Sequence, residues 1–503
     1  MKKMKKILII LTAMLLFNSC DKGFEDMNVD PTKPSQISAS TKFSYAQLYT
    51  EGEWYGSYLF YNVIQLMPNV QQINITSYHP IFTYKEGKNI HFFFEAQYAH
   101  TIKTLVDLEH QLKESNSATK DVDLALVKVQ KVLAFSRLTD VFGDIPYSEA
   151  GLGSIEGIRQ PKYDTQEDIY DDMLHSLEDA VATLDNGGNT SFGNADLMYA
   201  GDLGKWKKFA NSLMLRLAMR MVKIDEPKAQ TWAQKAIDGG VMTGNEDIAY
   251  LQMENNSNDQ GPNVNQLTKC FSSRHPNQIK ISKTFFDFLN NNNDPRLSVL
   301  CSTVDGNTDP ALQSGQDIND FNRGAANSKP NINIFGGSGN IIYDAPFFFQ
   351  TYAEVEFMLA EAAHRWGFAG GNTAAETHYN AGVTAAMQYL SMYGHGVDIP
   401  QSEIDAYLAA NPFDTNNALK MINEQYWVAT FGNGIESFSN WRRSGYPELV
   451  PMDVANNLTG GEIPRRFIYP GSEKLNNSEE LQKAIDRLAG GDHNTSRVWW
   501  DAL

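Results

Sequence analysis

The sequence predicts a mostly α-helical protein, in which tetratricopeptide-like helix pairs form a scaffold that carries large irregular loop excursions and little β-structure. Several segments repeat apolar residues at helical spacing, and these segments come in adjacent pairs. Between them lie long stretches rich in Asn, Asp, Gly and Pro that show no period. The chain has 503 residues, 42% hydrophobic and 20% charged. That composition is ordinary for a folded chain with a sizeable core.

The clearest helix pair follows residue 351. Its first helix is expected from Tyr352 to Trp366 and ends at a cluster of glycines, with Glu354 and Glu361 mostly outward. Its partner is expected from Ala374 to Leu390, with small alanines at the crossing positions. This pair is like a tetratricopeptide repeat, although no strict 34-residue signature recurs along the chain.

Further helices are expected on both sides of this pair. One runs over residues 164–184 and opens with Thr165 and Asp168 in the spacing of a capping box. Another carries Trp206, Phe209, Leu213 and Leu217 on one stripe. Besides the pair after residue 351, helix pairs are expected in 92–138, 164–222 and 400–431.

Strand signals are few, and loop signals are long. Short strands are predicted at 74–84 and 331–335. Residues 251–266 and 302–339 are polar, rich in glycine or asparagine, and without period. Loops of that length inside a globular chain are usually functional.

The N-terminus has the form of a lipoprotein signal. Four lysines among the first six residues precede the apolar run Ile7–Phe17, which is too short to span a bilayer, since spanning takes about 20 apolar residues. Cys20 follows this run, at the point where bacterial lipoproteins are cut and acylated. We therefore expect a signal peptide at 1–19, a lipidated tether at 20–38 and one α-helical domain at 39–503.

Charge and cysteine content exclude several classes of protein. A formal charge of −18 argues against nucleic acid or an anionic membrane face as the main partner, because both repel an acidic surface. Three cysteines cannot form a disulfide scaffold or a Cys-rich zinc module. Cys270 and Cys301 are predicted to be two separate buried thiols rather than a disulfide.

No catalytic or cofactor motif stands out. His91 and Glu95 lie four residues apart, but the three phenylalanines between them indicate the start of a packed helix rather than a metal site. The glycines from Gly151 to Gly157 have the wrong spacing for a dinucleotide fingerprint, and Ser338 lacks the closing glycine of a nucleophile elbow. We expect no catalytic residue, no metal and no cofactor. A carboxylate pair at glycosidase spacing stays open as an alternative, because no motif selects one.

Several segments resemble one family. They are the stretch 139–150 (TDVFGDIPYSEA), the helix 353–362 (AEVEFMLAEA), the segment 441–447 (WRRSGYP) and the segment 463–470 (IPRRFIYP). Together with Cys20, NVDPTKP after it and the closing VWWD, they occur in the family's order along the chain. The chain is identified by this resemblance as a member of the SusD/RagB family of outer-membrane lipoproteins.

The resemblance implies a fold, a location and a partner. Family members are non-enzymatic, tetratricopeptide-bearing lipoproteins that sit as a lid on a SusC-like TonB-dependent outer-membrane transporter. The acidic residues after Cys20 resemble the surface-export signal of Bacteroidetes lipoproteins, so an outer-membrane location facing the cell exterior is expected. Lid and barrel enclose a nutrient before import, usually a glycan and in some members a peptide.

The ligand-contacting residues cannot be carried over from the family, so they are predicted from chemistry. Aromatic faces pack on the C–H faces of sugars, while amides and charged groups bond the hydroxyls. The candidate ligand-binding residues are Tyr78, Phe82, Tyr84, Phe335 and Tyr343, with Gln71, Gln72 and Asn74 nearby in sequence. The Arg442-Arg443 and Arg465-Arg466 pairs are instead expected to hold carboxylates or helix C-termini.

The sequence therefore predicts a cell-surface lipoprotein that captures an oligosaccharide and delivers it to a SusC-like transporter. The alternatives are a peptide ligand, a surface glycoside hydrolase, and an adaptor that stabilises the transporter without binding a nutrient.

Overall fold

The computed structural model describes most of the chain after the predicted tether. The described residues are 37–52, 55–76, 91–255, 261–271, 278–302, 317–318, 327–335, 343–394, 396–453 and 457–502. Helices dominate them, and the strands form only two-stranded sheets. The predicted fold class is thus confirmed. Among these residues no helix is long and apolar enough to cross a membrane.

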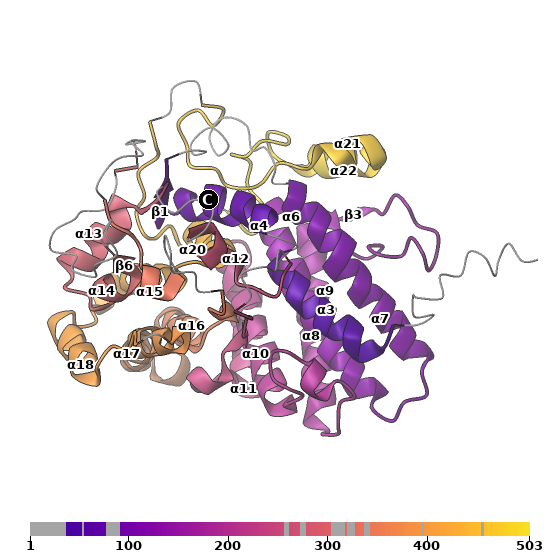
Figure 1. The fold of residues 1–503 in the computed structure, drawn as a ribbon, viewed down its shortest axis with the longest axis horizontal. Coiled ribbons are helices and arrows are strands. Elements are labelled where there is room, and N and C mark those ends of the chain that lie inside the picture. The colour runs from indigo at the N-terminus through magenta and orange to yellow at the C-terminus, as the bar shows by residue number, and fades with distance from the viewer. Residues whose placement is uncertain are drawn as a thin grey trace, which may run out of the picture.

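The N-terminal part is helical, and its long helices lie together on one side of the molecule, at the right of Figure 1. Its elements are α3 (Ala39–Glu51), α4 (Tyr55–Tyr58), the π-helix η1 (Leu59–Leu66), α5 (Met67–Asn69), α6 (His91–Ala96), the π-helix η3 (Gln97–Ile102), α7 (Lys103–Glu114) and α8 (Lys120–Phe142). Three more helices continue the array: α9 (Gln166–Asp185), α10 (Leu203–Arg220) and α11 (Glu226–Gly239). Each of α8 to α11 packs on the next, as the helical periodicity predicts.

Local signals explain where these helices begin. The Thr165 side chain accepts a hydrogen bond from the backbone N–H of Asp168 at the start of α9, as expected for an N-cap. Asp202 caps α10 in the same way. The apolar stripe of α10 is fully buried, and each such Leu or Phe side chain contributes about 1.5–3 kcal/mol on leaving water.

The opposite side of the molecule holds the C-terminal helix pairs. They are α16 (Tyr352–Trp366), α17 (Asn372–Gln388), α18 (Gln401–Ala410), α19 (Ala418–Ala429) and α20 (Gly434–Ser444). The last two helices, α21 (Gly471–Asn476) and α22 (Ser478–Arg487), lie instead near the N-terminal helices, at the upper right of Figure 1. The bounds predicted for α16 are confirmed: Thr351 and Glu354 form a capping box at its start, and Gly367 ends it in the left-handed conformation with φ 74°. Figure 1 shows α10, α16 and α20 between the two sides.

Short elements connect these helices. The helices are α12 (Gln266–Lys269), α13 (Lys283–Asn291), α14 (Arg296–Leu300) and α15 (Ile332–Phe335). Single 3-10 turns are η4 (Gly193–Ala195), η5 (Met221–Lys223), η6 (Asn245–Asp247), η9 (Phe368–Gly370), η10 (Tyr389–Tyr393) and η11 (Thr415–Asn417). The antiparallel strand pairs are β1 (Ile73–Ile75) with β5 (Ile279–Ile281), β2 (Ile145–Pro146) with β3 (Tyr163–Asp164), β4 (Ala249–Leu251) with β8 (Phe347–Gln350), and β6 (Cys301–Ser302) with β7 (Lys329–Pro330).

The prediction of a strand at 331–335 is wrong. The strand β7 ends at Pro330, and the next residues turn into the helix α15. The carbonyl of Asn331 accepts the N–H of Phe335 at 2.8 Å, which closes a helical turn. Five residues of alternating apolar character are too few to separate a strand from one turn of helix. For the other predicted strand, 74–84, the structure shows β1 at Ile73–Ile75, and residues 77–90 lie outside the described part.

The prediction that Glu354 and Glu361 point outward is also wrong. Both side chains are 1% exposed. Helix α16 is covered by α10, α17 and α19, so it has no wide solvent face. Buried carboxylates in such a helix need cationic partners, and arginines from other helices provide them.

Candidate functional site

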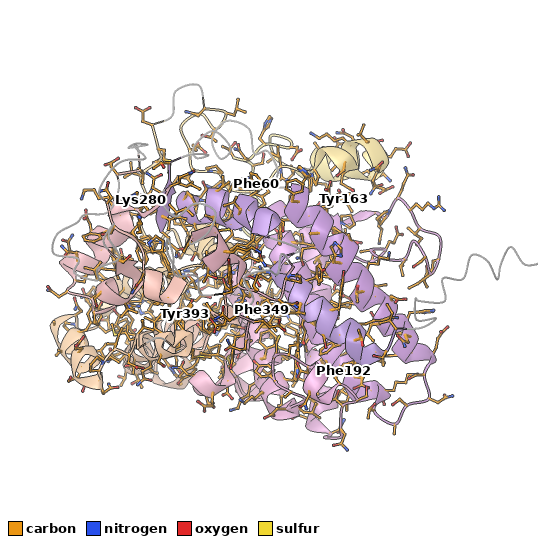
Figure 2. The ribbon with its side chains drawn as sticks, viewed as in Figure 1. Phe60, Tyr163, Phe192, Lys280, Phe349 and Tyr393 are labelled. Carbon is orange, nitrogen blue, oxygen red and sulfur yellow. The ribbon has the colours of Figure 1, made fainter. Side chains whose placement is uncertain are left out.

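We call the face of the molecule around Phe60 and the start of α6 the loop-bearing face, and its described edge is aromatic. Helix α6 begins there with His91 and Phe92, directly after residues 77–90 in the sequence. The ring centroids of Phe92 and His91 lie 4.2 Å apart, and those of Phe92 and Phe60 lie 5.9 Å apart. Phe60 and Phe92 are only partly buried, and Figure 2 places Phe60 at the upper edge of the molecule. Two partly exposed rings side by side suit the apolar face of a sugar.

Sequence reasoning missed this edge, although a signal was present. Phe92, Phe93 and Phe94 are consecutive, and successive residues on a helix are about 100° apart, so three of them cannot all face one core. Phe93 and Phe94 are buried, whereas Phe92 is only partly buried and packs on Phe60 and His91.

The predicted ligand-binding residues fall into two groups. Tyr78, Phe82 and Tyr84 lie outside the described residues. Phe335 and Tyr343 are described, and they are 1% and 5% exposed.

The surroundings of Phe335 are those of a core residue. Its ring lies 5.4 Å from that of Phe271, 5.5 Å from that of Tyr393 and 5.8 Å from that of Phe431. Tyr343 is held through its backbone carbonyl, which accepts the N–H of Asn265 at 2.8 Å. Both rings would have to be uncovered before they contact a ligand.

The amides expected near the ligand hold parts of the chain together. Gln72 donates to the carbonyl of Trp427 and to the hydroxyl of Ser437, both at 2.9 Å. Asn74 donates to the carbonyl of Asp317 at 2.8 Å. Gln72, which directly precedes β1, is thus attached to α19 and α20, and Asn74 within β1 is attached to a residue distant in sequence.

The arginine pairs are part of the scaffold, as predicted. Arg443 binds both oxygens of Glu361, at 2.7 and 2.8 Å. Arg466 donates to the carbonyl of Phe142 at the end of α8, at 3.0 Å, and pairs with Asp492 at 2.7 Å. The first contact satisfies a buried carboxylate and the second a helix C-terminus.

Arg465 and Arg442, the remaining members of the two pairs, also bind groups of the scaffold. Arg465 forms an ion pair with Asp501, which is buried. Arg442 donates to the backbone carbonyls of Asp140 and Arg465, at 2.5 and 2.8 Å, and lies 4.5 Å from the ring centre of Trp500. Burial lowers the pKa of Arg442 to about 9 against the opposing effect of nearby Asp501 and Asp140.

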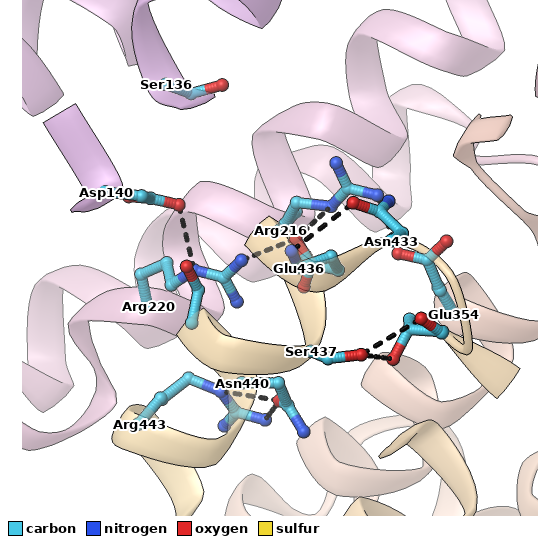
Figure 3. A network of polar contacts seen from close by, with 12 residues as sticks. Ser136, Asp140, Arg216, Arg220, Glu354, Asn433, Glu436, Ser437, Asn440 and Arg443 are labelled. Atoms are coloured by element: carbon cyan, nitrogen blue, oxygen red, sulfur yellow. Dashed lines mark hydrogen bonds and ion pairs between the residues drawn. The ribbon is translucent and has the colours of Figure 1, made fainter. Parts of the chain in front are cut away.

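A chain of buried charges joins the two sides of the molecule (Figure 3). Arg220 of α10 pairs with Asp140 of α8 at 3.3 Å and with Glu436 of α20 at 2.5 Å. Arg216 pairs with Glu436 at 3.3 Å and with Glu354 of α16 at 2.7 Å. Four helices from distant parts of the sequence are therefore tied at one point.

The charges in this network are unevenly compensated. Burial alone would raise the pKa of Glu436, but Arg216 and Arg220 lower it to about 2. Burial raises the pKa of Glu354, although Arg216 acts against the rise. The network is a structural element rather than a catalytic site, because all its groups pair with one another and are buried.

The cavity beside the network is too small for a ligand. It measures about 30 Å³ and is lined by Tyr58, Glu354 and Tyr389, among other residues. Ligand pockets usually measure about 300–1,000 Å³, whereas about 10–15 Å³ is enough for one water. This cavity has room for water only.

The cysteines agree with the expectation of separate thiols. Cys270 and Cys301 are both free and buried. Cys20 lies outside the described residues. In the described part of the chain no group of three or more His, Cys, Asp or Glu side chains forms a metal-binding arrangement.

Comparison with known proteins identifies the fold. A protein described as chitin-binding superimposes with a TM-score of 0.81 and 30% identity, covering 93% of this chain and 100% of that one. A SusD-like protein from Bacteroidetes, AC2a, gives a TM-score of 0.80 and 26% identity over the same shares. A SusD homologue from Bacteroides uniformis has a TM-score of 0.77 at 23% identity, covering 93% of this chain and all of that one. Comparison with curated proteins gives no match.

A family profile described as "Starch-binding associating with outer membrane" matches residues 30–470. The helical scaffold and this match place the chain in the class of non-catalytic, outer-membrane-associated glycan-binding proteins. The chain belongs to the SusD-like family. Membership of this non-catalytic family confirms the expectation that the chain is not an enzyme. It also excludes the alternative of a surface glycoside hydrolase.

Proposed function

We propose that this protein is a cell-surface lipoprotein, anchored through Cys20, that captures an oligosaccharide and delivers it to a SusC-like TonB-dependent transporter. The observation that carries the proposal is the match to a chitin-binding protein over 93% of the chain at 30% identity. Chitin fragments, which are chains of β-1,4-linked N-acetylglucosamine, are therefore the first ligand class to test. Membership of this family supports the proposed transporter partner and the proposed outer-membrane location.

The described surface supports a sugar ligand at the loop-bearing face. Phe60 and Phe92 supply partly exposed rings, and we propose that Tyr78, Phe82 and Tyr84 in the adjoining segment complete the contact. Aromatic faces pack against C–H-rich sugar faces, and neighbouring polar side chains bond the hydroxyl and acetamido groups. No bond of the ligand is broken by this chain.

The test is calorimetry of the full chain, purified in detergent, against chitin oligosaccharides, other glycans and peptides. We expect saturable binding of a glycan, and a loss of about tenfold or more in affinity for Phe92→Ala and Tyr84→Ala. Phe368→Ala is the matched control, because Phe368 is a partly buried aromatic on the turn after α16. Binding of peptides alone would favour the peptide alternative, and silence across the panel would favour the adaptor.

The anchor and the partner have separate tests. Mass spectrometry of the purified chain should find acyl groups on Cys20 and none in the Cys20→Ser variant. Co-purification from outer membranes should recover a barrel transporter with the acylated chain. A chain that purifies alone from gently solubilised membranes would contradict the proposed partnership.

A further inference from the structure

A second surface with the features of a binding site lies away from the aromatic edge. It is a groove of about 650 Å³ between α6, η3, the loop 150–161 and α21. Figure 1 shows α6, β3 and α21 close together at the upper right of the molecule. The volume is in the range of ordinary ligand pockets. We call this surface the α21 groove.

The walls of the α21 groove are fixed to one another. Four hydrogen bonds do this: Ser472 to Glu95 at 2.7 Å, Gln160 to the carbonyl of Asn476 at 3.0 Å, Asn477 to the carbonyl of Pro161 at 2.8 Å, and Tyr163 to Glu473 at 2.8 Å. The groove is therefore preformed, and a ligand does not have to order it. Its two carboxylates, Glu95 and Glu473, already accept bonds from the protein.

Other polar groups in the groove have no protein partner. Within the described residues, the side chains of Lys103, Ser154, Arg159 and Asn476 line it and form no hydrogen bond or ion pair with the protein. The aromatic part of the lining is Tyr98, which is partly buried and packs on the buried ring of Phe94, with ring centroids 4.6 Å apart. Unpaired donors and acceptors beside an aromatic wall match a sugar, which has hydroxyl groups on its edges and C–H groups on its faces.

The chemistry of the groove favours a glycan over an extended peptide. Peptides that bind in extended form usually add a strand to an exposed sheet edge, through backbone hydrogen bonds. The strand residue among the described lining residues is Pro146 of β2, which has no N–H to donate. Side chains provide the free polar groups instead.

The groove and the aromatic edge share a helical surface. Phe92 and Glu95 are three residues apart on α6, and Glu95, Ala99 and Lys103 then follow along the floor of the groove. From Phe92 to Lys103 the helical rise is at most about 16 Å, because the π-helix η3 rises less per residue than an α-helix. That distance accommodates several consecutive sugar units.

We propose that the α21 groove is a second glycan subsite, which binds distal units of the chain whose first units lie at the loop-bearing face. This inference rests on the proposed function. It assigns Lys103 and Arg159 as specificity-determining residues for chain length, because both line the groove with cationic donors that are not used by the described part of the protein.

The experiment is a length series of chitin oligosaccharides, from the disaccharide to the octasaccharide, measured with the full chain. We expect affinity to rise about tenfold or more once the oligosaccharide is long enough to enter the groove. The double variant Lys103→Ala/Arg159→Ala should lose this rise and keep its affinity for the shortest ligand that binds. Lys205→Ala is the matched control, because the Lys205 side chain also forms no hydrogen bond or ion pair within the described part of the chain and lies on α10.

Hydrogen exchange gives a readout that does not depend on variants. Long oligosaccharides should protect amides of the loop 150–161, and short ones should not. An affinity that is the same at all lengths, or a length-dependent rise that survives in the double variant, would overturn the groove subsite and leave the proposed function standing. Binding of no glycan at any length would overturn both. Peptide binding that depends on Lys103 and Arg159 would assign the groove to peptides instead.

Discussion

Arg443 and Glu361 form a two-pronged ion pair across 82 residues of sequence, and each side chain is 1% exposed. Arg443 comes from α20 and Glu361 from α16, so the pair fastens the late helices to each other. Two nearly coplanar N–H donors from one guanidinium satisfy both carboxylate oxygens, which lowers the pKa of Glu361 against the effect of burial.

Replacing Arg443 should be costly. Arg443→Ala leaves Glu361 charged and buried, so we expect the free energy of unfolding to fall by about 3–5 kcal/mol. Urea denaturation measures this change. Arg365→Ala is the control, because Arg365 bonds the same carboxylate but its side chain is 21% exposed, and we expect a loss of about 1 kcal/mol or less. Equal losses in the two variants would contradict the importance of the buried pair.

Glu51 should make the protein less stable as the pH rises. Burial raises its pKa from 4.5 to about 8, against smaller lowering effects of the Gln266 N–H and Arg137. Between these values the folded chain holds one proton that the unfolded chain has released, so stability falls with increasing pH. The full loss is up to about 5 kcal/mol.

Glu51→Gln removes this titration. The difference in unfolding free energy between the variant and the natural chain should grow in favour of the variant from pH 5 to pH 8.5. Chemical denaturation at several pH values measures it. A difference that stays constant with pH would show that Glu51 is ionised in the folded chain.

A Phe335 variant can distinguish a role of this side chain in core packing from a role in ligand binding. Phe335→Ala should lower the free energy of unfolding by about 3–5 kcal/mol, because it empties a space among Phe271, Tyr393 and Phe431. Thermal or urea denaturation gives the stability, and calorimetry on the folded fraction gives the affinity. Unchanged stability with a large loss of glycan affinity would restore Phe335 as a contact residue.

Gly382 allows α16 and α17 to approach closely. A Cβ at this position would lie 2.7 Å from the ring of Phe357. Alanine favours a helix over glycine by about 1 kcal/mol, but the overlap costs about 1–3 kcal/mol, so Gly382→Ala should be neutral to destabilising. Adding Phe357→Leu should make the alanine favourable relative to glycine. A stabilising Gly382→Ala in the natural background would show that the ring moves freely.

The two buried thiols should be unreactive in the folded chain. Burial raises the pKa of the Cys301 thiol, so little thiolate is present at neutral pH. In a Cys20→Ser background, a thiol reagent should label neither Cys270 nor Cys301 until denaturant is added, and then both. Failure to label after denaturation would indicate a disulfide.

The helices could be predicted from sequence where their apolar stripe and caps are local. The bounds of α16 and the N-cap of α9 are such cases, because Thr351, Gly367 and Thr165 act within one turn of helix. The positions of Glu354 and Glu361 could not be predicted in this way. Their burial depends on arginines that arrive from α10 and α20, far away in the sequence.

In the candidate site, too, features set by local sequence could be predicted and features set by distant residues could not. The arginine pairs could be assigned to the scaffold because two adjacent guanidinium groups in an acidic chain need carboxylates or carbonyls. The α21 groove could not be foreseen, since its walls come from residues 94–103, 146–161 and 472–476 and meet only in the folded molecule.

The contacts of the last residues have a consequence for the order of events during biosynthesis. The indole of Trp500 donates to Asp140 at 3.2 Å and lies against Arg442, and Asp501 holds Arg465. A nascent chain that has emerged only to residue 490 therefore has the cationic side of this core without its aromatic wall and without one of its carboxylates. Such a chain cannot finish packing this part of its centre until Trp500 and Asp501 have been added.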